Sequence, residues 1–265
     1  MKSQLSLISS SFLPGYSLGL QIDLAEAWKK NDERILITSD DFQYYVIASS
    51  LFSSKIEGNS LDLNSFMNQR KNRSFIKRKD VEEIEDLVKG YHFARENPIS
   101  IGNFLKAHGI LSKKLVEAKN RGKFRKHKVG VYDTSTGRPV YLAVEPEFVS
   151  IETGKLFDDI SVLLSEEINL DEVFYYASMI HLWAAKIHPF ADGNGRAARL
   201  LEKWFLVSKL GDQAWSINSE KYYWDQRPDY YNHIALGFNY YALHWDRCFP
   251  FLFMLPAALI ASHAT

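Results

Sequence analysis

The sequence predicts a mainly α fold that carries one β-hairpin. Apolar side chains recur at helical spacing through most of the 265 residues, and one segment alternates β-branched and aromatic residues around a polar turn. A hydrophobic fraction of 46% over this length is enough to bury one full core. The sequence has no internal repeat, low-complexity tract or clear linker, so we expect one helical unit with its N-terminal helices packed on it.

The expected helices are recognised by an apolar stripe and by capping or breaking residues at their ends. Ser39 or Asp40 can cap the first helix, and Gly58 ends it as a left-handed C-terminal cap would. Pro98 ends the second, because the residue before a proline is disfavoured in a helix. The expected helices span residues 40–56, 80–96, 101–115, 147–165, 171–187, 196–209, 229–241 and 245–262.

Residues 128–146 break this helical rhythm. β-branched and aromatic residues flank the polar stretch from Asp133 to Gly137, which is typical of a β-hairpin with a polar turn. A lone hairpin in a helical protein has exposed edges, so it is either covered or used to pair with another chain. A decorated loop is the alternative on this evidence.

Charge and composition argue against several classes of function. Lys plus Arg and Asp plus Glu both total 32, so no overall field attracts the chain to nucleic acid or to an anionic membrane. The basic stretch between Leu61 and Lys79 is followed by the acidic segment 82–86, and we expect it to be a solvated connecting face. The most apolar run, 249–260, is about half the ~20 residues of a membrane-spanning helix and is interrupted by prolines.

The N-terminus and the cysteine usage favour a cytoplasmic location. Residues 1–15 are polar and rich in serine, without the apolar stretch of a signal peptide. Cys248 is the single cysteine, so we expect it to be a buried small hydrophobe rather than part of a disulfide or metal cluster. The expected class is a cytoplasmic protein with no nucleic-acid or membrane partner. A homodimer is compatible with the sequence.

The stretch from His188 to Arg199 concentrates groups that suit a phosphate site. Its sequence is His-Pro-Phe-Ala-Asp-Gly-Asn-Gly-Arg-Ala-Ala-Arg, and it joins two expected helices. The backbone of Gly193-Asn194-Gly195 can adopt positive φ, so that its N–H groups converge on an anion, and the dipole of the next helix adds to this site. Arg196 and Arg199 are three apart on that helix, so both guanidinium groups can reach one polyphosphate.

The same stretch supplies a base and a metal ligand. Pro189 ends the first helix just after His188 and leaves the imidazole beside the loop. Asp192 offers the hard oxygen ligand that a phosphate-bound magnesium ion prefers. Each feature alone is common, since a lone histidine near a helix end is usually structural and an arginine pair is usually solvated. Their combination in one short stretch argues against a purely structural role.

These residues match every fixed position of H-x-F-x-x-G-N-G-R-x-x-R, and the chain therefore resembles the Fic family. Gly122 to Arg125 resembles the G-x-Y/F-R that precedes the family's flap hairpin, and Asp229 to Tyr231 resembles the start of the helix that closes over the adenosine. The resemblance begins at about residue 40 and implies a Fic-type helical bundle with one β-hairpin flap. Residues 1–95 would be an N-terminal helical region, and residues 96–265 the catalytic core with its flap (128–146) and C-terminal helices.

The resemblance implies a protein adenylyltransferase, because members of the family typically transfer AMP from ATP to a hydroxyl side chain of a target protein. His188 would be the general base for the incoming Ser, Thr or Tyr hydroxyl. Asp192 would hold Mg²⁺, and the backbone from Gly193 to Gly195 would receive the charge that develops on the α-phosphate. A subgroup with lysine at position 195 transfers the γ-phosphate instead, so Gly195 favours the AMP-transferring orientation. Another nucleotide or a phosphocholine-type donor stays open on this evidence.

The resemblance also assigns the remaining contacts. Arg196 would steady the β-phosphate and Arg199 the γ-phosphate. Val129 and Val131 of the flap and Tyr230 of the later helix would line the nucleotide site. The target protein would dock on the flap hairpin as an added strand.

Residues 53–58, Ser-Ser-Lys-Ile-Glu-Gly, resemble the family's inhibitory motif S/T-x-x-x-E-G/N. Ser53 and Glu57 are four apart on one helix face, so the hydroxyl can orient the carboxylate. The resemblance implies that Glu57, just before Gly58 at the end of an inhibitory helix over about residues 40–58, reaches into the nucleotide site and pairs with Arg199. Arg199 could then not hold the γ-phosphate, and ATP would bind unproductively.

Other functions stay open on the sequence. A glutamate of this kind positions a hydrolytic water in some relatives, so removal of AMP from a modified target is a second enzymatic interpretation. A non-catalytic nucleotide-binding regulatory module is a third, although a pure binder has no need of the base His188. A DNA-binding role is the weakest, since many relatives carry a separate winged-helix domain after the core and only ~65 residues follow Arg199 here.

Overall fold

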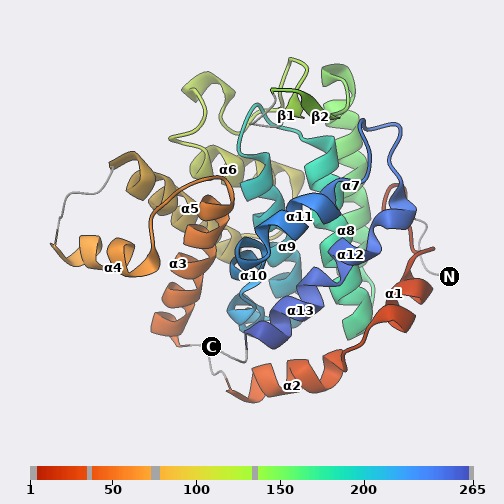
Figure 1. Cartoon of the computed structure of the whole chain (residues 1–265), viewed down its shortest axis with the longest axis horizontal. Helices are drawn as coiled ribbons and strands as arrows, with labels where there is room; N and C mark the ends of the chain where they lie inside the picture. Colours follow the sequence, from red (N-terminus) through yellow and green to blue (C-terminus); the bar gives the residue numbers. More distant parts are fainter. Residues whose placement is uncertain (1–4, 35–37, 73–77, 133–136, 263–265) are drawn as a thin grey trace.

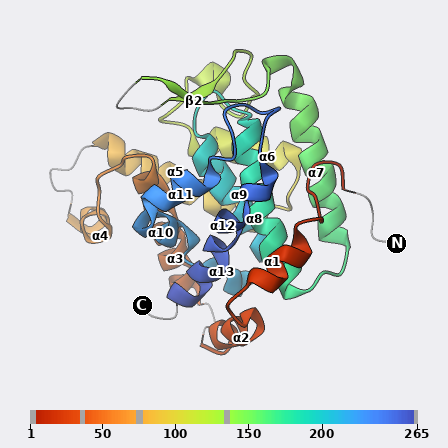
Figure 2. The same ribbon diagram turned by 45° about the vertical axis from the view of Figure 1, so that its right-hand side comes forward.

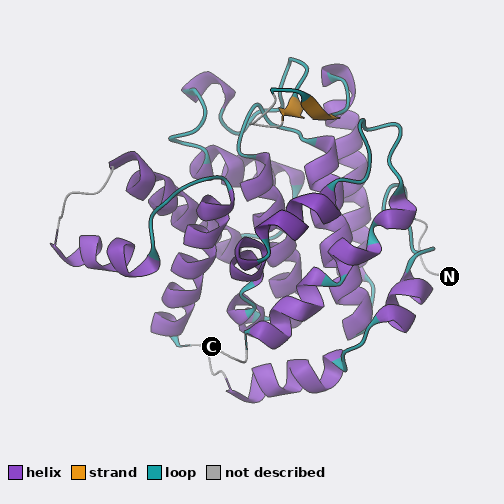
Figure 3. Ribbon diagram, viewed as in Figure 1, coloured by secondary structure: helices purple, strands orange, loops and turns teal. Residues whose placement is uncertain are grey.

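Helices dominate the structure, and one small pair of strands accompanies them (Figure 3). The computed structural model describes residues 5–34, 38–72, 78–132 and 137–262 of the chain. Its elements confirm the predicted mainly α fold with a hairpin. None of its helices within the described ranges is long and apolar enough to cross a membrane.

Two long helices, α8 (Leu170–Ile187) and α9 (Asn194–Leu210), lie side by side in the middle of the molecule (Figure 1). α8 begins at a capping box, in which Asn169 accepts from the Glu172 N–H and the Glu172 carboxylate accepts from the Asn169 N–H. Almost every side chain of α8 is buried, so the other helices pack around it. The short loop 188–193 joins α8 to α9.

The other elements are arranged around this pair. Figure 2 shows α7 running along α8, on the side away from α3. The remaining helices are α1 (Leu13–Gly19), α2 (Leu24–Arg34), α3 (Ser39–Ile56), α4 (Leu63–Asn72), α5 (Arg78–Glu96), α6 (Ile101–Leu111), α7 (Val149–Ser165), α10 (Ser219–Asp225), α11 (Arg227–Ile234), α12 (Phe249–Leu252) and α13 (Met254–Ala261). Short 3-10 turns are η1 (Ala118–Asn120), η2 (Pro146–Phe148), η3 (Asp212–Ser216) and η4 (Trp245–Arg247).

Buried apolar side chains form two clusters that share α9. The larger one surrounds α8 and includes Tyr16 of α1 and Phe251 of α12. The smaller one joins Leu51 of α3 and Leu87 of α5 to Trp204 of α9. Fully burying an apolar side chain of this size stabilises a fold by about 1.5–3 kcal/mol. α3 is therefore fixed to α9 by apolar packing as well as by the polar contacts described below.

The N-terminal segment, in which the sequence indicated no particular helix before residue 40, contains α1 and α2 and is anchored on α7. The Asp159 carboxylate accepts from the backbone N–H groups of Ser6, Leu7 and Ile8 at 2.6–2.8 Å. Asp159 is 2% exposed, so these bonds satisfy a carboxylate that burial would otherwise penalise. Cys248 is buried, as predicted.

The hairpin consists of β1 (Gly130–Tyr132) and β2 (Pro139–Leu142), which pair antiparallel with Val131 opposite Tyr141. The second edge of β2 is also occupied: the Leu142 N–H donates to the Phe238 carbonyl at 2.8 Å and the Leu142 carbonyl accepts from the Tyr240 N–H at 3.1 Å. The outer edge of β1 is therefore the one left for another strand within the described residues. Residues 133–136 of the expected turn lie outside the described residues.

Several expected helix boundaries were wrong. α6 ends at Leu111 instead of residue 115, with Ser112 as its C-cap. α11 ends at Ile234 instead of 241, because the chain turns at Gly237, where a Cβ would lie 2.3 Å from the Ala242 carbonyl oxygen. The expected helix 245–262 is divided into η4, α12 and α13. The break between α12 and α13 lies just before Pro256, which lacks an N–H and whose ring clashes with the preceding turn.

The expectations for residues 38–79 also needed correction. Thr38 caps α3, in a capping box with Asp41, instead of Ser39 or Asp40. The polar stretch after Leu61 contains α4, which begins where the Asp62 side chain accepts from the Ser65 N–H at 2.9 Å. Residues 73–77, which include its basic residues Arg73 and Lys77, lie outside the described residues.

Candidate active site

The loop between α8 and α9 is closed by its own side chains. α8 ends at His188, which has φ 54° and ψ 59° and is the one non-glycine residue of positive φ among those described. The Asn194 amide spans the loop: its Oδ1 accepts from the Phe190 N–H at 2.8 Å and its Nδ2 donates to the Phe190 carbonyl at 2.9 Å. Since Asn194 is also the first residue of α9, the loop is fixed against the N-terminus of that helix.

His188 is held as a neutral imidazole. Its Nδ1 lies 3.2 Å from the Ala185 carbonyl oxygen, which can only accept, so Nδ1 carries the proton and Nε2 keeps its lone pair. Burial lowers the pKa of His188 to about 4, and the nearby Arg125 lowers it too, while Glu57 opposes the shift. A neutral ring with a lone pair on Nε2 at pH 7 suits a general base.

This lowered pKa can be measured directly. We expect the Cε1–H proton resonance of His188 to keep its neutral position from about pH 8 to about pH 5, because burial disfavours the charged ring. An NMR titration checks this, with the His188 signal assigned by its disappearance in the His188→Asn variant. A titration midpoint near the ordinary value of 6.5 would contradict the expectation.

A second buried histidine, which sequence analysis missed, fixes Asp192. The ring of His108 on α6 is stacked on Phe190, with centroids 3.5 Å apart. Because its Nδ1 accepts from the Gly122 N–H at 3.1 Å, its Nε2 carries the proton and donates to the Asp192 carbonyl at 2.9 Å. Burial lowers the pKa of His108 to about 4, so this arrangement of donor and acceptor persists at neutral pH. The Asp192 side chain itself is exposed, and its Oδ1 accepts from the Gly193 N–H at 2.6 Å.

Arg199 of α9 is surrounded by groups from α3 and α11. Its Nη2 donates to Glu57 Oε1 at 2.7 Å, and its Nη1 donates to the Tyr230 hydroxyl at 3.1 Å. Ser53 accepts twice, from Nε at its hydroxyl (2.9 Å) and from Nη2 at its carbonyl (3.0 Å). The sequence predicted that Ser53 orients Glu57, whereas the hydroxyl contacts Arg199 directly. The Arg199 side chain is 1% exposed and the Glu57 side chain 27%.

The carboxylate of Glu57 lies at the N-terminus of α9. Gly193 caps this helix without a side-chain hydrogen bond, and a Cβ at Gly195 in its first turn would lie 2.3 Å from Glu57 Oε1. Burial raises the pKa of Glu57, but Arg199, Arg196 and then His188 lower it by more, so its pKa is below the ordinary value. An ionised carboxylate thus occupies the positive end of a helix, where anions bind. Gly58, at φ 105°, follows it and ends α3.

The close approach of Gly195 to Glu57 makes a prediction about stability. Gly195→Ala should lower the free energy of unfolding by about 1–3 kcal/mol, because the methyl group overlaps Glu57 Oε1. In the Glu57→Gly background the same change should cost much less, since only the contact with Arg199 Nη1 at 3.2 Å remains and alanine is favoured in a helix. Urea unfolding of the four proteins of this cycle measures the coupling. An equal cost in both backgrounds would mean that the two residues do not touch.

Arg196 is also paired with an acidic residue, which the sequence did not reveal. Its Nε and Nη2 donate to Glu83 Oε1 of α5 at 3.1 and 2.7 Å, and the Ser54 hydroxyl of α3 donates to the same oxygen at 2.6 Å. The side chains of this pair are 8% and 9% exposed. Both arginines that the sequence assigned to phosphates therefore contact carboxylates of the N-terminal helices.

Tyr230 belongs to a buried chain of polar groups behind Arg199. Its hydroxyl lies 3.0 Å from His181 Nε2, and His181 Nδ1 lies 2.7 Å from Glu202 Oε2. The Tyr223 hydroxyl donates to the same carboxylate at 2.9 Å. The sequence placed Tyr230 beside the adenosine. The structure places its hydroxyl against Arg199, and the chain of partners restricts where that guanidinium can point.

Arg125 connects the hairpin to the loop. Its Nε donates to the His188 carbonyl at 2.7 Å, and its Nη2 donates to the Val144 carbonyl just after β2. Val129 directly precedes β1, where its carbonyl accepts from the Ala143 N–H at 3.2 Å, and Val131 lies within β1 with 38% of its surface exposed. The two flap valines are thus placed on a hairpin that is tied to the histidine by one arginine.

The fold and the site together define a helical protein in which a short loop joins the two central helices and places a neutral histidine and a carboxylate beside the N-terminus of α9. Residues 98–206, which contain this loop, match the model of the Fic/DOC family. The chain is similar to a Fic family protein from Desulfovibrio desulfuricans G20, at 22% identity and a TM-score of 0.77, over 99% of this chain and 76% of that one.

Further solved structures share this fold. A Fic domain containing signaling protein from Bacteroides thetaiotaomicron VPI-5482 is 18% identical, with a TM-score of 0.72, over 92% of this chain and 94% of that one. Fic-1 from C. elegans is 20% identical, with a TM-score of 0.64, over 90% of this chain and 69% of that one. The helical bundle with its hairpin is therefore the fold of these Fic structures.

Proposed function

We propose that the protein transfers AMP from ATP to a Ser, Thr or Tyr hydroxyl of a target protein, and that Glu57 restrains this activity. The observation that carries the proposal is the position of His188. Its neutral imidazole ends α8, and a short loop joins it to the N-terminus of α9, the helix that carries Arg196 and Arg199. A base next to a phosphate-binding helix end suits attack of a hydroxyl on a phosphorus atom.

The proposed transfer step uses His188, the N-terminus of α9 and the two arginines of that helix. The target hydroxyl oxygen forms a bond to the α-phosphorus while its proton passes to Nε2 of His188. The bond between the α-phosphorus and the bridging oxygen breaks, and pyrophosphate leaves. The N–H groups at the start of α9 stabilise the charge on the α-phosphate. Arg196 and Arg199 hold the outer phosphates once their carboxylate partners release them.

Mg²⁺ fits this site through Asp192. Its carboxylate is exposed beside the loop, and Mg²⁺ bound to nucleotides typically takes one or two carboxylates together with phosphate oxygens and water. The described residues contain no cluster of three or more acidic, histidine or cysteine side chains suited to a metal. Asp192 would therefore hold the ion together with the phosphates of ATP. The ion would neutralise charge on the leaving pyrophosphate.

Restraint by Glu57 follows from competition for one anion site. The carboxylate occupies the N-terminus of α9 and contacts Arg199 at 2.7 Å, so a phosphate that needs the same groups must displace it. Arg227 and Tyr231 of α11 strengthen the restraint, because both donate to the Ile56 carbonyl at the end of α3. These bonds fix the backbone at the end of α3, so Glu57 is released either by rotation of its side chain or by a movement of that turn.

The same carboxylate favours a second candidate, removal of AMP from a modified target. Glu57 lies close enough to His188 to raise the pKa of the imidazole, so it could orient a water molecule at the loop. Incubation of an AMP-modified protein with the wild type and with Glu57→Gly separates the two activities. Loss of AMP that needs Glu57 would favour hydrolysis.

The decisive experiment is a mass-spectrometric search for AMP adducts. A lysate is incubated with Mg-ATP and Glu57→Gly, and in parallel with Glu57→Gly/His188→Asn as the matched control. Adducts on Ser, Thr or Tyr in the first sample alone would support the proposal. Their absence from both samples would leave a nucleotide-binding regulatory module as the better account.

The hairpin is the proposed dock for the target, and its pairing restricts how the target binds. Both edges of β2 are occupied, so an added strand has to pair with the outer edge of β1. Val131 pairs with Tyr141 inside the hairpin, and the alternation of an antiparallel ladder turns the N–H and carbonyl of Gly130 outward. The Gly130 amide should therefore gain protection from hydrogen exchange when a target binds. A cytoplasmic location and a homodimer remain predictions.

A further inference from the structure

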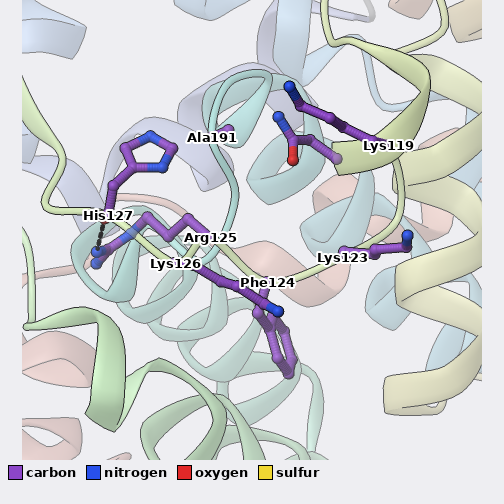
Figure 4. Close-up of a pocket in the computed structure, with 8 residues that line it drawn as sticks. Lys119, Lys123, Phe124, Arg125, Lys126, His127 and Ala191 are labelled. Atoms are coloured by element: carbon purple, nitrogen blue, oxygen red, sulfur yellow. Dashed lines mark hydrogen bonds between the residues drawn. The ribbon is translucent and has the colours of Figure 1, made fainter.

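A cavity of about 270 Å³ lies beside the loop, outside the groups proposed to hold the nucleotide (Figure 4). Its walls come from η1, from the segment that leads to the hairpin, and from Ala191 of the loop. In Figure 4 the imidazole of His127 and the side chain of Lys119 lie on opposite sides of Ala191. The lining residues are Lys119, Asn120, Lys123, Phe124, Arg125, Lys126, His127 and Ala191.

The cavity is positively charged although the whole chain is neutral. Residues 119–128 read K-N-R-G-K-F-R-K-H-K and contain no acidic residue. Arg121 and Arg125 are used by the fold, since they donate to backbone carbonyls. Lys119 contacts Glu117 at 2.8 Å, but both side chains are more than 70% exposed, so this pair is weak. Lys123 and Lys126 are exposed and have no acidic partner among the described residues.

The position of the cavity connects it to the proposed transfer. Ala191 precedes Asp192, and Arg125 in the cavity wall donates to the His188 carbonyl. His127 is three residues before β1, the strand with the open edge. A polypeptide that adds to β1 and presents a hydroxyl to His188 would therefore pass close to the exposed lysines.

We propose that this basic cavity binds an acidic segment of the target protein next to the modified hydroxyl. This inference rests on the proposed function and deepens it by naming the chemistry of the target. Charge complementarity selects the partner, because exposed lysines attract carboxylates and speed their encounter. Exposed apolar side chains on the adjoining hairpin, Tyr132 (57%) and Val140 (49%), favour a polypeptide over a nucleic acid.

Binding is tested without ATP, so that the result does not depend on transfer. The probe is a fluorescein-labelled peptide of about ten residues, glutamates around one tyrosine, measured by fluorescence anisotropy. The matched peptide has glutamine in place of glutamate. Lys123→Glu/Lys126→Glu should weaken binding of the acidic peptide roughly tenfold or more and leave binding of the glutamine peptide unchanged. Lys29→Glu/Lys30→Glu changes the same charge on α2, at the other end of the molecule in Figure 1, and should have no effect.

Three results would overturn the proposal. The first two are equal binding of both peptides and an equal loss of binding in both double variants. The third is a single-stranded oligonucleotide that binds more tightly than the acidic peptide and whose binding needs the same lysines. Failure of the proposed function looks different. In that case Glu57→Gly modifies no protein, while the acidic peptide still needs Lys123 and Lys126. If both proposals hold, Lys123→Glu/Lys126→Glu in the Glu57→Gly background should raise the KM for acidic targets and leave the KM for ATP unchanged.

Discussion

Replacing Glu57 with glycine is expected to increase AMP transfer, including transfer to the protein itself, by about tenfold to a hundredfold. The change removes the carboxylate that contacts Arg199 at 2.7 Å, and the freed guanidinium can hold the outer phosphate of ATP. A hydrogen bond to a charged group contributes about 1.5–3 kcal/mol, which corresponds to that range of rates. Transfer of radiolabel from [α-³²P]ATP to protein measures the gain.

The control for this gain in activity is a second substitution at Arg199. Arg199→Ala in the Glu57→Gly background should cancel the increase, because the released arginine is the group that orients the triphosphate. A double variant as active as the single one, or a single variant no more active than the wild type, would show that Glu57 does not restrain the enzyme.

Glu57→Gly should also be less stable than the wild type. Removing one partner of a buried ion pair costs about 3–5 kcal/mol at full burial, and the 27% exposure of Glu57 places this pair at or below the lower end. ATP binds only the folded protein, so saturating ATP should restore part of the lost melting temperature. Thermal unfolding with and without Mg-ATP measures both effects.

Removing the base should abolish transfer and leave nucleotide binding intact. His188→Ala is expected to lower the rate by about 10²–10⁴-fold, the usual contribution of a general base, while the start of α9 continues to hold the phosphates. Single-turnover rates in the Glu57→Gly background and the Kd for ATP give the two quantities separately.

The backbone of His188 requires a second variant. Its φ of 54° is unfavourable for alanine, so His188→Ala also strains the loop, whereas asparagine adopts this conformation more readily. His188→Asn should lose activity to the same extent with less loss of stability. The exposed His244 provides the matched control, since His244→Ala should retain full activity. Activity in both His188 variants would remove this residue from the mechanism.

The sequence predicted the parts of the site that are contiguous. His188, Asp192, Arg196 and Arg199 fall within twelve consecutive residues, so their proximity follows from their spacing. Helix ends that are marked by a residue of special backbone conformation, such as Gly58 after α3, were also predictable. No local pattern relates Glu57 to Arg199, which is 142 positions away. Only the family resemblance implied their contact.

The partners of these residues could not be predicted, because they come from distant elements. Glu83 reaches Arg196 across 113 positions, and His108 reaches Asp192 across 84. Each is one of several polar residues on an ordinary amphipathic helix, and such residues are usually exposed. Only the packing of α5 and α6 against α9 turns them toward the loop. The end of α11 failed for a similar reason, since pairing of the following segment with β2 and the close backbone approach at Gly237 determined it.

The buried face of α3 has a consequence for how the protein tolerates activation. Four of its buried residues are serines: Ser49, Ser50, Ser53 and Ser54. From Ser53 to its end, Ile56 is the only large apolar side chain that the helix buries. Unwinding of this last turn would expose hydroxyls that water satisfies, and little hydrocarbon that could stick to other chains. Movement of this turn would therefore expose few apolar atoms through which chains could aggregate.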